Sequence, residues 1–181
     1  MIKVFTGPMF SGKSKKLMEV YDSVDNKNII QCFKPKKDTR DFGIIKQRGD
    51  GREIKATLIN NLKEIRTKLR KTTEIIFIDE SQFLKGNVNH IINLHLNDNI
   101  DVYVSGLSKT SELKPFGLMP KIMAISDEIE ILKAICKFCG EDAYYTLYIG
   151  NQTKKKILVG NSEYAAVCEK CYKKTKSRKR K

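Results

Sequence analysis

The chemically most informative stretch of the chain is GPMFSGKS, residues Gly7–Ser14. Two glycines separated by four residues, followed by lysine and serine, form the pattern of a phosphate-binding loop. The stretch follows a short apolar run and precedes residues at helical spacing, which is the setting that the pattern requires. In such a loop, backbone N–H groups and the helix N-terminus surround phosphate oxygens. We expect Lys13 to reach the β- and γ-phosphates and Ser14 to bind Mg²⁺.

A pair of acidic residues, Asp79 and Glu80, follows the apolar run Ile75–Ile78. A carboxylate at the end of a buried strand can hold the Mg²⁺ of a bound nucleotide, and Asp79 fits that role. Glu80 would then lie beside the phosphates, where a carboxylate can orient or deprotonate an attacking oxygen of water or of an alcohol. These two motifs indicate a P-loop NTPase or a kinase and do not choose between them.

Four of the five cysteines occur as two CxxC pairs, Cys136 with Cys139 and Cys168 with Cys171. Two such pairs predict a tetrahedral zinc site, and a site of four thiolates is structural because it has no open coordination position. The metal would fix both ends of the segment between the pairs. The fifth cysteine, Cys32, lies in an apolar stretch and is expected to be inert core.

The elements that must position these residues alternate between strand and helix, which predicts a P-loop NTPase-like parallel sheet flanked by helices. We expect strands over 2–5, 28–34, 74–79 and 101–105, helices over 14–22, 60–71 and 88–96, and a flexible loop over 36–51. The predicted domains are an α/β nucleotide-binding domain (1–134), a zinc-ribbon or lasso domain with short strands (135–172), and a basic, disordered tail (173–181).

The chain carries 35 Lys and Arg residues against 21 Asp and Glu residues, a net charge of +14. Part of this charge lies in the terminal run Lys170–Lys181, so we expect a surface that favours anionic ligands and no specific nucleic-acid site. No apolar stretch approaches the roughly 18 residues that span a bilayer. The start of the chain does not fit a signal peptide, and we expect a cytoplasmic protein without a membrane partner. His90 and His95 are expected to be surface or packing residues.

Several motifs in order resemble those of the cellular, or type II, thymidine kinase family, from Val4 to Tyr172. They are GPMFSGKS, KDTR (37–40), IDESQF (78–83), KPFG (114–117), and the cysteine pairs with their neighbours AYYT and VGNSEYAAVCEKCY. The resemblance implies transfer of the γ-phosphoryl group of ATP to the 5′-hydroxyl of thymidine. It also implies a homotetramer that is inhibited by the end-product triphosphate.

The resemblance assigns roles residue by residue. Glu80 would accept the proton of the hydroxyl, Arg40 would neutralise developing charge, and Lys13 would act on the phosphates. Residues implied to bind ATP and Mg²⁺ are Gly7, Pro8, Met9, Phe10, Ser11, Gly12, Lys13, Ser14, Asp38, Asp79 and Gln82. Residues implied to bind thymidine are Met9, Phe83, Leu107, Ser111, Phe116, Lys155, Lys156, Ile157, Leu158, Val159, Gly160 and Tyr164. We expect Met9 to face the acceptor pocket and Phe10 to pack in the core.

The chain departs from the family pattern before KPFG, where Ser108 replaces the usual aspartate and Ser111 the usual aromatic residue. This predicts a smaller and more polar wall beside the base. Two other functions remain open at this point. One is a P-loop ATPase whose zinc ribbon and basic surface bind nucleic acid, and the other is a zinc-stabilised binding protein without catalysis.

Overall fold

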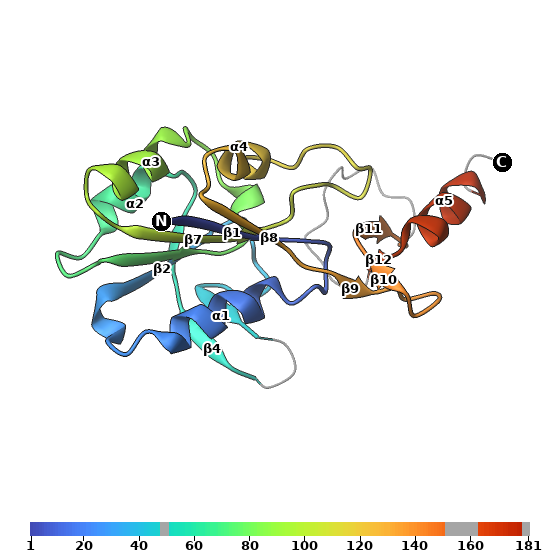
Figure 1. Ribbon diagram of the computed structural model, residues 1–181, viewed down its shortest axis with the longest axis horizontal. Coiled ribbons are helices and arrows are strands. Elements are labelled where there is room, and N and C mark those ends of the chain that lie inside the picture. The colour runs from blue at the N-terminus through green and yellow to red at the C-terminus, as the bar shows by residue number, and fades with distance from the viewer. Residues whose placement is uncertain (48–50, 151–162, 179–181) are drawn as a thin grey trace.

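A parallel sheet of six strands organises the chain up to residue 131 (Figure 1). The computed structural model describes residues 1–47, 51–150 and 163–178. The strand order is β5-β2-β6-β7-β1-β8, and every neighbouring pair is parallel. The strands are β1 (Ile2–Thr6), β2 (Ile30–Pro35), β5 (Thr57–Ile59), β6 (Ile75–Ile78), β7 (Asp101–Gly106) and β8 (Glu128–Ile131). The predicted α/β class is confirmed.

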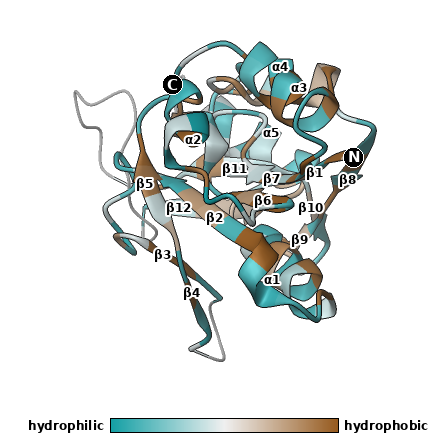
Figure 2. Ribbon diagram, turned by 90° about the vertical axis from the view of Figure 1, so that its left-hand side faces the viewer, coloured by the Kyte–Doolittle hydropathy of each residue, from teal (hydrophilic) through white to brown (hydrophobic). Residues whose placement is uncertain are grey.

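Helices cover both faces of this sheet, with α1 on one side and α2, α3 and α4 on the other (Figure 1). Their bounds are Lys13–Ser23 for α1, Lys63–Lys68 for α2, Asn89–Leu96 for α3 and Met119–Ala124 for α4. Two short 3₁₀ turns, Lys27–Ile29 and Ser81–Phe83, precede β2 and follow β6. Figure 2 shows apolar residues along the strands and on the helices that cover them.

Strand β6 shows how the sequence builds this layered core. Its residues are apolar without alternation, as expected for a strand that is covered on both faces. Ile76 and Ile78 join the core beneath α2, α3 and α4, whereas Phe77 points to the opposite face. There Phe77 stacks on Tyr103 at 5.1 Å between ring centroids and meets Tyr21 of α1 edge-on at 6.0 Å. Strand β6 is therefore packed on both faces, and this packing fixes the position of its carboxyl end.

The C-terminal residues form a small separate module beside the carboxyl end of the sheet (Figure 1). It contains two antiparallel strand pairs, β9 (Ala134–Ile135) with β10 (Asp142–Ala143) and β11 (Tyr145–Tyr148) with β12 (Tyr164–Val167). Helix α5 (Glu169–Arg178) follows and lies at the end of the molecule farthest from the sheet. A core of its own, with Leu147 and Val167 at 1% and 0% exposure, holds the module together.

Several local elements differ from the sequence prediction, among them helix α4 and strand β8, which it does not contain. The expected loop over 36–51 contains β3 (Ile44–Lys46), which pairs with β4 (Glu53–Lys55), because Ile45 buries itself in the core beneath α1. Strand β5 was not predicted, since three residues carry no periodicity. Helix α2 is shorter than the predicted 60–71.

Two further expectations are wrong. Residues 173–178, expected to be disordered, continue helix α5, where lysines favour the helix and Lys173 pairs with Glu169. Phe10 is 49% exposed and does not pack in the core, because its positive φ of 67° turns the chain at that residue. Residues 155–160 (KKILVG), where we expect one of the short strands of the zinc domain, and residues 179–181 lie outside the described ranges. None of the helices in the described ranges combines the length and apolar character needed to cross a bilayer.

Candidate active site

The phosphate-binding loop joins β1 to α1 at the carboxyl end of the sheet. Its first glycine, Gly7, has φ 154°, and a Cβ atom there would collide with the main-chain oxygen of Leu132 and with Oγ of Ser11. Its second glycine, Gly12, has φ 79° and is the N-cap of α1. Side chains are strained in these conformations, so the loop requires glycine at both positions. The same turn leaves the first N–H groups of α1 available to an anion.

Lys13 and Ser14 are the first residues of α1. The ammonium group of Lys13 donates to the carbonyl oxygen of Pro8 at 2.7 Å, so it lies over the loop. The hydroxyl of Ser14 donates to Oδ2 of Asp79 at 3.3 Å. The two motifs, 65 residues apart in the sequence, thus meet in space. A hydroxyl and a carboxylate at this spacing are oxygen ligands of the kind that Mg²⁺ prefers.

Asp79 lies directly after β6 and is 4% exposed. Its Oδ1 accepts a hydrogen bond from the hydroxyl of Ser105, at the end of the neighbouring strand β7. Burial and the adjacent charge of Glu80 raise the pKa of Asp79 to about 6. A divalent cation beside this carboxylate would favour its ionised form. The residues present therefore fit the predicted magnesium site.

Glu80 is held in an unusual backbone conformation at the start of the Ser81–Phe83 turn. Its φ is 52°, in the left-handed region that costs energy for residues other than glycine. Oε1 lies 2.8 Å from Nη2 of Arg40, and Oε2 accepts a hydrogen bond from Nε2 of Gln82 at 2.5 Å. Both carboxylate oxygens are thereby oriented, and the side chain is 17% exposed.

Arg40 reaches Glu80 from the connection between β2 and β3. The buried carboxylate of Asp38 holds the guanidinium, with Nε 2.7 Å from Oδ1 and Nη2 3.1 Å from Oδ2. Burial alone would raise the pKa of Asp38, but the charges and hydrogen bonds of Arg40 and Lys34 lower it. Asp38 therefore contacts two cations in this structure, and its part in magnesium binding stays a prediction.

Gln82, predicted to bind ATP and Mg²⁺, has other contacts in the structure. Its side chain is 3% exposed. Nε2 donates to Glu80, and Oε1 accepts a hydrogen bond from the backbone N–H of Leu107 at 3.0 Å. The amide therefore joins Glu80 to the first residue after β7, Leu107, which the family resemblance implies to be part of the thymidine pocket.

The predicted base wall is partly assembled. The rings of Phe83 and Phe116 meet edge-to-face at 5.5 Å between centroids. The backbone N–H of Met9 donates to Oγ1 of Thr146 at 2.9 Å, which ties the phosphate-binding loop to the zinc module. These contacts involve four distant parts of the chain.

Of two further predicted wall residues, Tyr164 lies in strand β12 of the zinc module and Ser111 contacts that module. The ring of Tyr164 meets Tyr148 at 5.3 Å, and the carbonyl oxygen of Ser111 accepts a hydrogen bond from the hydroxyl of Tyr172 at 2.7 Å. Lys155–Gly160 lie outside the described residues. Beside the phosphate-binding loop lies a cavity of about 520 Å³, and among the described residues it shares Gly7, Pro8 and the predicted wall residue Ser108 with the predicted site.

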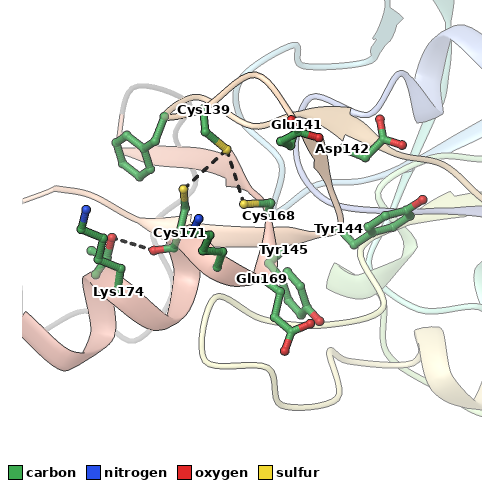
Figure 3. A pocket seen from close by; sticks show the side chains of 12 residues that line it. Cys139, Glu141, Asp142, Tyr144, Tyr145, Cys168, Glu169, Cys171 and Lys174 are labelled. Carbon is green, nitrogen blue, oxygen red and sulfur yellow. Dashed lines mark hydrogen bonds between the residues drawn. The ribbon is translucent and has the colours of Figure 1, made fainter.

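The four paired cysteines come together in the small module. Figure 3 shows three of them, Cys139, Cys168 and Cys171. The four Sγ atoms lie within 4.8 Å of one another. Sγ of Cys139 is 3.6 Å from that of Cys168 and 3.7 Å from that of Cys171. Tetrahedral zinc with Zn–S bonds of 2.3 Å separates its sulfurs by about 3.8 Å, so the cluster has the size of a zinc site.

The pKa values of two of these thiols, Cys136 and Cys171, bear on how the cluster would hold a cation. Desolvation opposes ionisation of Cys136, but backbone hydrogen bonds from Cys168, Phe138 and Cys139 outweigh it and lower the pKa to about 6. Desolvation and the neighbouring sulfurs raise the pKa of Cys171 to about 12. The thiolate form of Cys136 is thus favoured by the protein itself, whereas that of Cys171 requires a positive ion nearby.

Sequence reasoning missed several residues that build the site. Ser105 supports Asp79, Thr146 binds the phosphate-binding loop, and Lys34 is buried beside Asp38. Only Lys34 carried a signal, a lysine within the apolar stretch of β2. The contacts of the other two depend on tertiary structure.

Comparisons with known proteins agree with this arrangement. A family model described as "Thymidine kinase" matches residues 1–172. A thymidine kinase of Mycoplasma mobile is 35% identical over 174 residues, which cover 95% of this chain and 86% of the relative. A thymidine kinase of Mycoplasma genitalium is 35% identical over 172 residues, with 92% and 80% covered. The resemblance found in the motifs is confirmed, and the chain belongs to the thymidine kinase family.

Proposed function

We propose specific roles for the residues of this site in the reaction of the family. The protein is a thymidine kinase, an ATP-dependent phosphotransferase. Phosphoryl transfer depends mainly on positioning and on electrostatic stabilisation, and needs little covalent chemistry from the protein. The assignment rests on the position of Glu80. This residue directly follows Asp79, which accepts a hydrogen bond from Ser14, and its carboxylate lies between the side chains of Arg40 and Gln82.

Glu80 is the proton acceptor for the 5′-hydroxyl of thymidine. Its carboxylate is partly exposed and is fixed at both oxygens, so one lone pair can be presented to an incoming hydroxyl without reorganisation. Arg40 lies at the same carboxylate and would neutralise negative charge on the transferred group. The strained backbone of Glu80 is consistent with a functional position.

Gly7–Ser14 hold the triphosphate, with the ammonium of Lys13 placed at the β- and γ-phosphates. Ser14 and Asp79 would hold Mg²⁺, which supplies positive charge to the phosphate oxygens when it is bound. On this proposal a phosphate oxygen takes the place of the Pro8 carbonyl as an acceptor for the ammonium group of Lys13.

Thymidine lies against Phe83, Phe116, Leu107 and Tyr164. The segment Lys155–Gly160, between the two zinc-binding pairs, reads the pyrimidine edge through its backbone, which requires rigid ends of the kind that a zinc ion provides. A base with the wrong edge would leave buried polar groups unpaired, at about 1–3 kcal/mol each. Because Ser108 and Ser111 are small, the pocket is expected to accept bulkier substituents at the base.

We also propose a homotetramer, end-product triphosphate inhibition and a cytoplasmic location. Support for assembly comes from β8, an edge strand of the sheet on which Ile129 and Ile131 are 43% and 64% exposed. Exposed apolar edges are regularly covered by another chain. Size-exclusion chromatography with light scattering tests the assembly, and inhibition by thymidine triphosphate tests the regulation.

The direct test of the reaction is to incubate the protein with ATP, Mg²⁺ and labelled thymidine and to measure thymidine monophosphate. The proposal predicts product that requires all three components. If no monophosphate forms while DNA stimulates ATP hydrolysis in a salt-dependent way, the protein is a nucleic-acid-dependent ATPase instead.

A further inference from the structure

Lys34 carries a charged side chain inside the protein, with 2% of its surface exposed. It lies in β2, next to the strand β6 that leads to Asp79 and Glu80. Its ammonium group lies 3.1 Å from Oδ2 of Asp38. It also donates to the carbonyl oxygens of Asp41 and Ile44, at 3.0 and 2.9 Å. An ammonium group has three N–H donors, and here each of them has a partner.

The three partners span the segment that follows β2. Lys34 therefore gathers residues 38–44 around one point and sets the path of the chain that carries Arg40. Stability alone does not require an ion pair at this position, because hydrophobic residues of similar volume can often replace both partners of a buried pair without loss. The ammonium group instead specifies one geometry for the segment.

This geometry extends to the reacting centre through two ion pairs. Asp38 accepts from Lys34 on Oδ2 and from Nε of Arg40 on Oδ1, at 3.1 and 2.7 Å. Arg40 in turn lies 2.8 Å from Glu80. Lys34 and Asp38 are both buried, so solvent screens their interaction little.

We propose that Lys34 is a positioning residue for phosphoryl transfer, which acts through Asp38 to place the guanidinium of Arg40 at the carboxylate of Glu80. Lys34 itself does not touch the substrates. The inference rests on the roles proposed above for Arg40 and Glu80. It predicts that the effect of Lys34 on the rate depends on the presence of Arg40.

A double-mutant cycle tests this dependence. Lys34→Met, Arg40→Met and the double variant are compared with the unmodified protein by initial-rate kinetics of the phosphorylation of labelled thymidine. Lys34→Met is expected to lower kcat about tenfold or more with the KM for thymidine within about twofold, and to have less than about a twofold effect in the Arg40→Met background. Equal losses in both backgrounds would overturn the proposal.

Lys68→Met is the matched control. Lys68 donates to the carbonyl oxygen of Leu58 at 2.8 Å and pairs with Glu64 at 3.3 Å, but these partners lead to α2 and β5 and not to Arg40. Its kcat is expected within about twofold of the unmodified protein. If Lys34→Met does not fold, as judged by thermal unfolding, the same cycle is run with Lys34→Gln.

The two proposals fail in different ways. If the unmodified protein forms no thymidine monophosphate, the assigned function is wrong. If it forms the product and the Lys34 and Arg40 effects multiply independently, only the positioning role of Lys34 is wrong.

Discussion

Replacing Gln82 by leucine tests whether the orientation of Glu80 limits the reaction. Leucine keeps the approximate size of the side chain but removes both hydrogen bonds of the amide. A hydrogen bond to a charged acceptor contributes about 1.5–3 kcal/mol, which corresponds to roughly 10- to 150-fold in rate if it is needed in the transition state. The N–H of Leu107 loses its acceptor as well, which costs about 1–3 kcal/mol of stability.

The assay is initial-rate kinetics with thymidine varied at saturating ATP, together with thermal unfolding of each variant. Because the amide of Gln82 contacts the carboxylate of Glu80 and the backbone of Leu107, we expect kcat to fall within that range while the KM for ATP stays within about twofold. The KM for thymidine is expected to rise as well, since Leu107 belongs to the base wall.

Gln31→Leu provides a matched control for the loss of a buried amide. Gln31 is 9% exposed and lies at the start of β2, at the edge of the sheet opposite to the active site. Its side-chain amide donates to the carbonyl oxygen of Lys68 at 2.8 Å and accepts from the backbone N–H of Arg70 at 3.1 Å. The Gln31→Leu variant should lose a comparable free energy of unfolding and keep the kcat of the unmodified protein. If Gln82→Leu retains kcat within about twofold, or if Gln31→Leu loses rate equally, the amide does not orient Glu80 for catalysis.

Three further outcomes follow from the site. Cys136→Ser should reduce bound zinc from one ion per chain to less than about 0.1, measured by elemental analysis, and should weaken thymidine binding more than ATP binding. Unchanged thymidine affinity would mean that the metal is not needed for substrate recognition. Burial and the charge of Asp79 raise the pKa of Cys32 to about 12, so at pH 8 only about one molecule in ten thousand carries the thiolate. A disulfide reagent should therefore leave Cys32 unmodified in the folded protein and modify it in urea, and rapid labelling of the folded protein would show that the site is accessible. Gly7→Ala should weaken ATP binding at least about tenfold in a calorimetric titration, because a Cβ atom collides with Leu132 and Ser11; full affinity would mean that the loop relaxes.

The features that could be predicted from the sequence are those whose signal is local. The phosphate-binding loop, the acidic pair after β6 and the two cysteine pairs each need only a few neighbouring residues to be recognised. Their setting could be predicted because β6 and α1 have unambiguous apolar patterns. The tertiary meeting of Ser14 with Asp79 then follows from the rule that parallel strands end at the same edge.

The features that could not be predicted depend on partners far apart in the sequence or on very short elements. Nothing near Gln82 indicates that its amide binds Leu107, and nothing near Thr146 indicates that it binds Met9. Strand β5 has three residues, too few to show a period. The exposure of Phe10 depends on a positive φ that apolar character alone does not reveal.

The central claim is that Glu80, fixed between Arg40 and Gln82, accepts the proton of the thymidine hydroxyl. The most direct measurement is single-turnover phosphorylation of thymidine by Glu80→Gln with saturating ATP and Mg²⁺, with ATP affinity measured on the same sample. We expect ATP to bind within about twofold of the unmodified protein and the rate to fall about 100-fold or more. An equal rate at equal ATP affinity would contradict the claim.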